Sequence, residues 1–241
     1  MQIEDSVALV TGANRGIGAR FVAQLLDRGA RRVYATARRP ETLASLVNGA
    51  PDRVVPLRLD ITDVDQVAAA ARAAGDVNLL VNNAGVLAFG GPLDGDLDMA
   101  ERDMAVNYLG TLKALRGLVP VIEANGGGAV LNVLTIVGFA PMPALGGYCA
   151  SKAAAHCLTQ ALRGQVAGKG ITVHGVYPAG VDTDMLAGVD FPKADPADVV
   201  RAALDGLAAG DEEILPDPIS AEAYKFYLSD PKGLERQNLG V

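Results

Sequence analysis

The stretch that decides the fold is "TGANRGIG", residues 11–18. It joins the apolar run "SVALVTGA" (6–13) to "IGARFVAQLLDRG" (17–29), whose apolar residues recur with helical spacing. Glycines at positions 12, 16 and 18 lack a Cβ, so the backbone here can turn tightly and approach a ligand. A glycine-rich turn between a strand and a helix is typical of a pyrophosphate site at the helix N-terminus. The alternative is a glycine-rich turn that binds nothing.

Strand-like and helical patterns alternate along the rest of the chain. We expect further strands at 31–37, 52–60, 77–85, 127–136, 171–178 and 212–217, and further helices at 63–75, 97–125, 148–168 and 196–210. This alternation predicts an α/β fold in which helices cover both faces of a doubly wound parallel sheet. We expect one domain over residues 1–241, with a substrate lid at 182–195 and a C-terminal tail from about 218.

Composition limits the partners of the chain. The formal net charge is −7, which argues against nucleic acid or an anionic membrane as the main partner. The N-terminus lacks a signal-peptide pattern, and no apolar run approaches the roughly 20 residues that a membrane-spanning helix needs. The two cysteines and two histidines have no metal-ligand spacing, so we expect no metal site. We expect a cytoplasmic protein.

The end of the second expected strand indicates which dinucleotide is bound. NAD sites usually carry an acidic residue here for the ribose 2′-hydroxyl. This chain has Thr36, Ala37 and Arg38 instead, and Arg15 lies in the glycine loop. A hydroxyl and a guanidinium suit a 2′-phosphate, which an acid would repel. The residues therefore favour NADP(H); the alternative is that Arg38 belongs to a solvated turn.

A second chemical pattern is Tyr148 and Lys152 in "YCASK". Residues at i and i+4 share a helix face, and a nearby ammonium lowers the pKa of a phenol, which is ordinarily near 10. Such a pair suits proton transfer at an alcohol oxygen while hydride moves on the adjacent carbon. Thr135 ends the preceding strand, so its hydroxyl would project at the ligand-binding edge of the sheet. The alternative for the pair is an ordinary surface contact.

Together these motifs resemble the short-chain dehydrogenases/reductases in their compact, single-domain, NADP-preferring, carbonyl-reductase-like form. The resemblance covers about residues 5–185 and rests on "TGANRGIG", "LD" (59–60), "NNAG" (82–85), "AVNYLG" and "YCASK" in this order. It implies a Rossmann-type fold and a homodimer or homotetramer, built on the helices at 97–125 and 148–168. It also implies Tyr148 as acid/base, Lys152 on the nicotinamide ribose, Asn107 holding a relay water, and a substrate-orienting hydroxyl at position 135.

The resemblance further implies the residues that contact the cofactor. Asp60 and Ile61 would lie along the adenine, and Asn82, Ala84 and Gly85 beside the adenosine ribose. The implied set is Gly12, Asn14, Arg15, Gly16, Ile17, Gly18, Thr36, Arg38, Asp60, Ile61, Asn82, Ala84, Gly85, Tyr148, Lys152, Pro178, Ala179, Val181 and Thr183. Two positions depart from the family pattern: Ala179 replaces a glycine, and Thr135 replaces the usual serine. We expect Ala179 to be tolerated unless its φ is positive.

These observations predict an NADP(H)-dependent oxidoreductase that reduces a ketone or aldehyde to an alcohol. Tyr148 would donate the proton, and Thr135 would orient the carbonyl of a small-molecule substrate. If Thr135 instead faces away, the protein is a non-catalytic NADP(H)-binding sensor. An epimerase on the same scaffold is a third reading.

Overall fold

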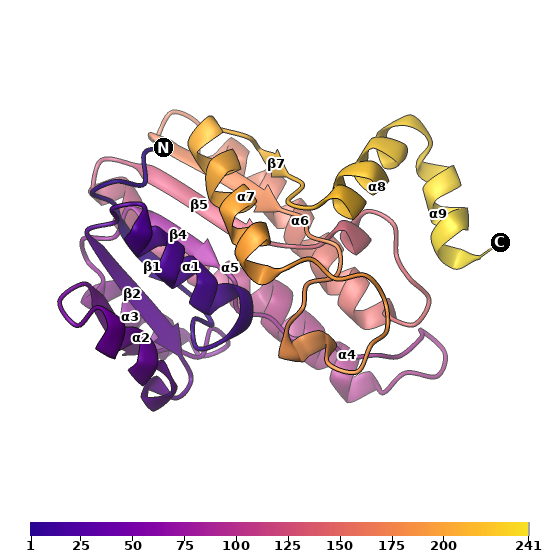
Figure 1. Ribbon diagram of the computed structural model, residues 1–241, viewed down its shortest axis with the longest axis horizontal. Helices are drawn as coiled ribbons and strands as arrows, with labels where there is room; N and C mark the ends of the chain where they lie inside the picture. The colour runs from indigo at the N-terminus through magenta and orange to yellow at the C-terminus, as the bar shows by residue number, and fades with distance from the viewer. Residues whose placement is uncertain (241) are drawn as a thin grey trace.

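The computed structural model describes residues 1–240 and contains a seven-stranded parallel sheet between two layers of helices (Figure 1). The strands are β1 (Val7–Val10), β2 (Arg32–Ala37), β3 (Val54–Arg58), β4 (Leu79–Asn82), β5 (Gly128–Val133), β6 (Ile171–Val176) and β7 (Glu213–Ile214). Each expected strand is present, although several are shorter than predicted. The doubly wound, single-domain fold predicted from the sequence is confirmed.

The order of the strands in the sheet indicates where a ligand would bind. The order is β3-β2-β1-β4-β5-β6-β7, so the chain winds outward from β1 in one direction and then returns to β4 on its other side. Leu9 pairs with Tyr34 on one neighbour and with Leu80 on the other. Ligands of such sheets bind at the carboxyl ends of the strands where the order reverses. The loops after β1 and β4, which carry "TGANRGIG" and "NNAG", meet at this point.

Alternate side chains of the strands form two apolar cores. Ala8 and Val10 of β1 face helices α1 (Gly16–Asp27) and α7 (Pro196–Ala209). Val7 and Leu9 face the opposite layer, which contains α3 (Val64–Ala73), α5 (Thr111–Ala124) and α6 (Gly146–Val166). Because both faces are covered, β1 is apolar at every position and the neighbouring central strands are mostly apolar, without a regular alternation of polar residues.

The helix expected at 97–125 runs without a break to Ala124, but it is not α-helical throughout. It comprises α4 (Leu97–Asp103), a π-helical segment at Met104–Gly110, and α5. Such widened turns are frequent at functional sites. Gly110 packs against Ile61, since an added Cβ would lie 2.8 Å from its side chain. The apolar periodicity continues across all three segments, so it could not reveal the change of helix type.

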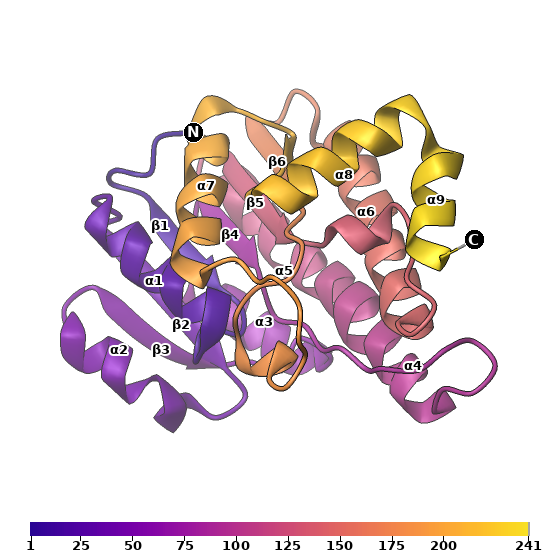
Figure 2. The same cartoon turned by 45° about the vertical axis from the view of Figure 1, so that its right-hand side comes forward.

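The expected C-terminal tail is wrong for residues 218–239. They form α8 (Pro218–Ser229) and α9 (Pro231–Leu239), which lie at one end of the molecule (Figure 2), where α8 contacts the 3-10 turn Ile136–Gly138. Asp217 begins α8 with a capping box, in which its carboxylate accepts from Ser220 N and Ser220 Oγ faces its backbone N–H. Asn238 of α9 donates to the Ala140 carbonyl. Residues 40–49, for which we predicted no helix, form a 3-10 turn (Pro40–Leu43) and α2 (Ala44–Gly49).

The segment predicted as a lid forms a loop with paired ends. Asp182 N donates to Ala194 O, and Ala194 N donates to Gly180 O, so residues 182–194 leave and rejoin the fold at one place. Inside the loop is a 3-10 turn, Asp184–Leu186. The loop lies over the carboxyl end of the sheet, between α7 and α4 (Figure 2).

Candidate active site

A single elongated cavity of about 1770 Å³ extends from the glycine loop to the C-terminal helices. The predicted site residues that line it are Gly12, Asn14, Arg15, Gly16, Ile17, Gly18, Arg38, Asp60, Ile61, Ala84, Gly85, Thr135, Tyr148, Lys152, Pro178, Ala179, Val181 and Thr183. Three predicted residues do not line it: Thr36, Asn82 and Asn107. The fold therefore brings most of the predicted set together from seven separate parts of the chain.

The glycine loop is shaped so that its backbone faces the cavity. Gly12 and Gly16 have φ of +65° and +53°, which side-chain-bearing residues rarely adopt. Gly18 has an ordinary φ, but an added Cβ would overlap the Gly12 carbonyl and come within 2.6 Å of Asn83 Nδ2. The loop thus presents its backbone to the cavity at the start of α1, the place where the sequence predicts a pyrophosphate site.

Asn83 is a site residue that the sequence argument missed. Its Nδ2 donates to the carbonyls of Thr11 and Gly12, and Thr11 Oγ1 accepts from the backbone of Asn83 and Ala84. These bonds tie the loop after β4 to the glycine loop. Its neighbour Asn82 points elsewhere and donates to Asn132 on β5. The doubled asparagine was the signal, but strand alternation alone did not say which of the two faces the loop.

The expected role of Thr36 is not supported. Its side chain is fully buried and lies outside the cavity, and its hydroxyl has no hydrogen-bond partner within residues 1–240. Strand alternation is the cause, because Thr36 points to the opposite face of β2 from Ala37, which does line the cavity. Arg38 and Arg15 both reach the cavity. Arg15 forms a 2.9 Å ion pair with Asp184 of the lid loop.

The segment after β6 closes one side of the cavity. Ala179 does not have a positive φ, so the backbone strain that would disfavour alanine there is absent. Its N–H donates to Asp217 at the start of α8. Val181 is buried, and Thr183 lies against Gly16, where an added Cβ would be 3.2 Å from its methyl group. The loop after β6 therefore contacts both the glycine loop and the C-terminal helices.

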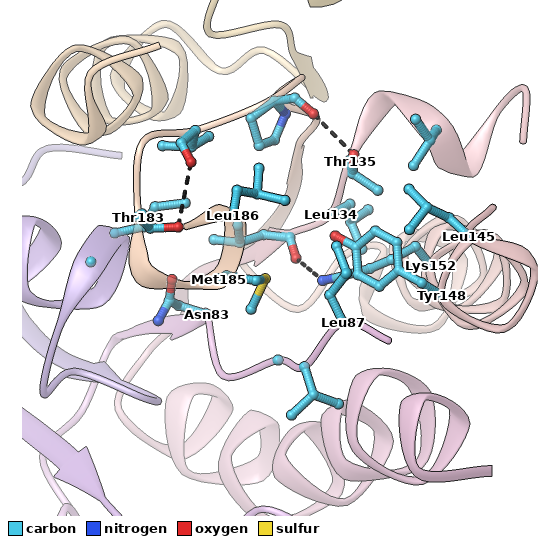
Figure 3. A pocket seen from close by; sticks show the side chains of 18 of the residues that line it. Asn83, Leu87, Leu134, Thr135, Leu145, Tyr148, Lys152, Thr183, Met185 and Leu186 are labelled. Carbon is cyan, nitrogen blue, oxygen red and sulfur yellow. Dashed lines mark hydrogen bonds between the residues drawn. The ribbon is translucent and has the colours of Figure 1, made fainter. Parts of the chain in front are cut away.

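Three polar side chains meet where β5 and α6 border the cavity (Figure 3). Thr135 follows β5 and donates from Oγ1 to the Pro178 carbonyl over 3.1 Å. Tyr148 and Lys152 lie one turn apart on α6, and Lys152 Nζ is 5.9 Å from the centre of the Tyr148 ring. Lys152 Nζ donates to the Val133 carbonyl over 2.9 Å. All three side chains are buried, so their charges and hydroxyls are little screened by water.

The electrostatics of the pair differ from the expectation. Burial raises the pKa of Tyr148 above its ordinary value, the charges of Cys149 and Asp103 raise it further, and the Thr135 hydroxyl acts in the opposite direction. Burial lowers the pKa of Lys152 to about 8, and Asp103 acts against that decrease. The predicted lowering of the phenol pKa by Lys152 is therefore absent here. The ammonium is directed to the Val133 carbonyl, and desolvation of the phenol dominates.

Asn107 joins three parts of the fold through hydrogen bonds. It lies in the π-helical segment, and its Oδ1 accepts from Val86 N while its Nδ2 donates to Val86 O and Ser151 Oγ. Its carbonyl accepts from Thr111 Oγ1. Because its side-chain amide is used in this way, it joins the loop after β4 to α6 and does not face the cavity.

The far end of the cavity is lined mainly by apolar side chains, with Glu222 of α8 and Gln237 and Asn238 of α9 among them. Loops 86–89 and 142–145, the lid loop and α8 and α9 contribute its apolar side chains, which are Leu87, Phe89, Met142, Leu145, Met185, Leu186, Val189, Phe191, Ile219, Phe226 and Leu234. Figure 3 shows Met185 and Leu186 across the cavity from Tyr148. An apolar space beside a proton-donating group suits a substrate with a hydrophobic body and one reacting oxygen.

Comparison with known proteins agrees with this geometry. The family model described as short chain dehydrogenase matches residues 6–192. The chain belongs to the short-chain dehydrogenase family. Like other members of that family, it is an oxidoreductase. The glycine loop and the helix that carries Tyr148 and Lys152 contain the motifs on which the sequence resemblance rests.

Individual relatives cover nearly the whole of this short-chain dehydrogenase. A crystal structure of a short chain dehydrogenase from Burkholderia cenocepacia in complex with NADP is 40% identical, with a TM-score of 0.94 over 99% of both chains. One from Sphingobium yanoikuyae in complex with NADPH is 29% identical, with a TM-score of 0.82 over 95% of this chain and 94% of that one. An uncharacterized oxidoreductase of Staphylococcus saprophyticus is 31% identical and covers 86% of this chain and 93% of its own length.

Two further findings concern residues 1–240. None of the described helices has both the length and the apolarity to cross a bilayer. Within the same residues, no three His, Cys, Asp or Glu side chains come together as metal ligands.

Proposed function

We propose that this short-chain dehydrogenase uses NADP(H) to reduce a ketone or aldehyde to an alcohol. The observation that carries the proposal is the meeting of Thr135, Tyr148 and Lys152 in a cavity that begins at a glycine cradle. The cofactor, when bound, supplies the hydride. Two relatives whose crystal structures contain NADP or NADPH support the choice of cofactor.

The chain has residues suited to each part of the cofactor. The loop of Gly12, Gly16 and Gly18 suits the pyrophosphate, because Gly12 and Gly16 have positive φ and a side chain at Gly18 would collide with the Gly12 carbonyl and displace the loop. Arg15 and Arg38 would hold the 2′-phosphate, and Asp60 and Ile61 the adenine. Pro178, Ala179, Val181 and Thr183 would border the nicotinamide. When the cofactor binds, Arg15 would leave its ion pair with Asp184 and pair with the 2′-phosphate.

Tyr148 is suited to act as the acid. Burial favours the uncharged phenol, so at neutral pH it holds the proton that a developing alkoxide needs. Thr135 would turn its hydroxyl from the Pro178 carbonyl to the substrate oxygen; Pro178 would keep its bond from Ile136 N. Lys152 would hold the nicotinamide ribose. A relay water at Asn107 would use the second lone pair of the Asn107 carbonyl.

The surface suggests self-association. The π-helical segment exposes Leu109 and α4 exposes Leu97, at 41% and 71%. Together with α5 and α6, these elements would form the contact between copies of the chain, as the family resemblance implies. Light scattering of the purified protein distinguishes a dimer or tetramer from a monomer.

The first test is NADPH oxidation with a panel of apolar ketones, aldehydes and diketones, with Tyr148→Phe in parallel. We expect turnover by the wild type, and a loss of at least about a hundredfold in the variant with NADPH binding retained. NADPH binding without any turnover across the panel would favour the sensor. Interconversion of epimers without net NADPH consumption would favour the epimerase.

A further inference from the structure

A buried carboxylate at the start of α8 binds two parts of the chain that are distant in sequence. Asp217 is 8% exposed. Its Oδ1 accepts from Ser220 N over 2.8 Å and caps α8. Its Oδ2 accepts from Ala179 N over 3.0 Å, in the loop after β6. One side-chain oxygen is enough to cap a helix, so the second bond requires a separate explanation.

The sequence around Asp217 restricts its backbone. It lies between two prolines in "LPDPI" (215–219). A residue that precedes proline is confined to extended conformations, and Asp217 has φ of −143° and ψ of 158°. Pro218 suits the first position of α8 because it has no N–H that would need a partner there. The backbone that carries the carboxylate therefore has few conformations open to it.

The bond from Ala179 N fixes the plane of the Pro178–Ala179 peptide. In a trans peptide such as this one, the N–H and the carbonyl point in opposite directions. The N–H points to Asp217, so the Pro178 carbonyl points away from it. That carbonyl accepts from Thr135 Oγ1 and from Ile136 N, each over 3.1 Å. One planar unit thus lies between the Asp217 carboxylate and the Thr135 hydroxyl.

α8 contacts the segment after Thr135 a second time. Phe139 follows the 3-10 turn that begins there, and its ring centre lies 5.1 Å from those of Tyr224 and Tyr227 on α8. α8 also contributes to the far end of the cavity, with Ile219, Glu222, Ala223 and Phe226. Shared contacts therefore set the positions of this cavity wall and of Thr135.

We propose that Asp217 is a positioning residue of the active site, whose carboxylate orients the Pro178–Ala179 peptide so that its carbonyl holds the Thr135 hydroxyl at the cavity. The inference rests on the proposed function of Thr135. Asp217 does not line the cavity and acts through the peptide. A carboxylate on the N–H side also makes the carbonyl a stronger acceptor, because hydrogen bonds in a chain polarise one another.

The first test does not depend on activity, so it stands if the proposed reaction is wrong. Protein is prepared with carbon-13 at the proline carbonyls and nitrogen-15 in alanine. NMR then selects the amides of Pro–Ala pairs, of which the sequence has three, at 143–144, 178–179 and 196–197. Ala179→Gly removes one of these signals and thereby assigns it.

The decisive variant in this test is Asp217→Ser. Serine caps a helix about as well as aspartate but has a single oxygen, so the bond from Ser220 N is kept and that from Ala179 N is lost. We expect the Ala179 signal to shift and its exchange with solvent to become at least about tenfold faster. Ala197, which donates to Asp195, is unchanged. An Ala179 amide that keeps its shift and its exchange rate overturns the proposal.

The matched control is another helix cap. Asp230 begins α9 and accepts from Gly233 N over 2.9 Å, and it does not line the cavity. Asp230→Ser therefore leaves the Ala179 signal in place. If it shifts that signal as Asp217→Ser does, the change reflects loosening of the C-terminal helices and the proposal is overturned.

The kinetic test separates positioning from capping. Asp217→Ser lowers kcat for carbonyl reduction about tenfold, because the hydroxyl that orients the substrate oxygen is displaced. Ser220→Ala breaks the capping box from its other side, so Tm falls, but kcat stays within about twofold because the bond from Ala179 N remains. An equal loss of kcat in Ser220→Ala means that Asp217 acts only by starting α8, which overturns the proposal.

The effect of Asp217 must also pass through Thr135. In a Thr135→Val background, adding Asp217→Ser lowers kcat by no more than about twofold, since the hydroxyl is already absent. A further loss of about tenfold overturns the proposal. Absence of turnover in the wild type counts against the proposed function alone, and the Ala179 amide still decides whether Asp217 holds the peptide.

If Asp217→Ser does not fold, Asp217→Asn replaces it. The amide of asparagine also has one oxygen, so it cannot accept from Ala179 N and Ser220 N together. We expect one of these two amides to lose its protection from exchange. Protection kept at both overturns the proposal.

Discussion

The two ends of the cavity are built differently. The nucleotide end consists of backbone at the switch point of the sheet, where Gly12, Gly16 and Gly18 leave no room for side chains. The substrate end consists of side chains from loops and from α8 and α9, and several of them are partly exposed, including Met142 at 44% and Phe191 at 39%. Tyr148 and Lys152 stand between the two ends on a single helix.

This difference determines which substitutions each end of the cavity tolerates. A backbone cradle accepts one shape of ligand, and almost any side chain added to it is a collision. An apolar wall of separate side chains tolerates substitution, since each one contributes only part of the contact area. We therefore expect changes at the nucleotide end to act on cofactor binding, those at the substrate end to act on KM, and those between them to act on the rate.

The largest effect is expected between the two ends, at Thr135. Thr135→Val keeps the shape but removes the hydroxyl, and kcat falls about a hundredfold if that group orients the substrate oxygen. Thr135→Ser keeps the hydroxyl and stays within about threefold of wild type, with altered stereoselectivity because a methyl is lost. Steady-state kinetics with NADPH measure both. Equal, unchanged rates for the two variants mean that Thr135 faces away from the chemistry.

At the nucleotide end, Gly18→Ala places a methyl against the Gly12 carbonyl and Asn83. Overpacking of this kind costs about 1–3 kcal/mol, so NADPH affinity falls by roughly ten- to a hundredfold. The control is Gly164→Ala on α6, where no atom lies within 4 Å of an added Cβ. That variant binds NADPH normally and is slightly more stable. Fluorescence titration with NADPH measures both; equal affinities contradict the cradle.

A smaller effect concerns the choice of cofactor. Arg38→Ala removes a guanidinium that reaches the cavity, and we expect NADPH affinity to fall about tenfold while NADH affinity stays within twofold. Arg31→Ala, an exposed arginine outside the cavity, changes neither. The ratio of the two dissociation constants is the measurement. A parallel loss for both cofactors means that Arg38 does not contact the 2′-phosphate.

The smallest effect is expected at the substrate end. Phe191→Ala opens the lid loop where its ring packs on Gly180, and KM for a bulky apolar ketone rises about fivefold with NADPH affinity unchanged. Leu228→Ala removes an exposed side chain of α8 that does not line the cavity and leaves KM alone. If Phe191→Ala changes NADPH affinity instead, the nucleotide end and the substrate end of the cavity do not bind their ligands independently.

The sequence predicted the nucleotide end well because its signals are local. Glycine positions, strand runs and the i, i+4 pair each follow from a few adjacent residues, and the structure places nearly all of them on the cavity. The predicted role of Thr36 is not supported because side chains alternate along β2, and that of Thr36 points to the face opposite Ala37. Asn83 was missed because its importance depends on contacts between distant segments. The two C-terminal helices were missed because α9 has few apolar residues, and because the apolar residues of α8 are spread around the helix and do not form one clear face.

The most direct test of carbonyl reduction at Tyr148 is the transfer of deuterium from NADPH to the product. A ketone that the enzyme accepts is reduced with NADPH carrying deuterium at both C4 positions, and the alcohol is examined by mass spectrometry and NMR, with Tyr148→Phe in parallel. We predict one deuterium on the carbinol carbon in the wild-type product and none above background with the variant. NADPH bound tightly by the wild type, with no deuterium in any product, would contradict reduction at Tyr148.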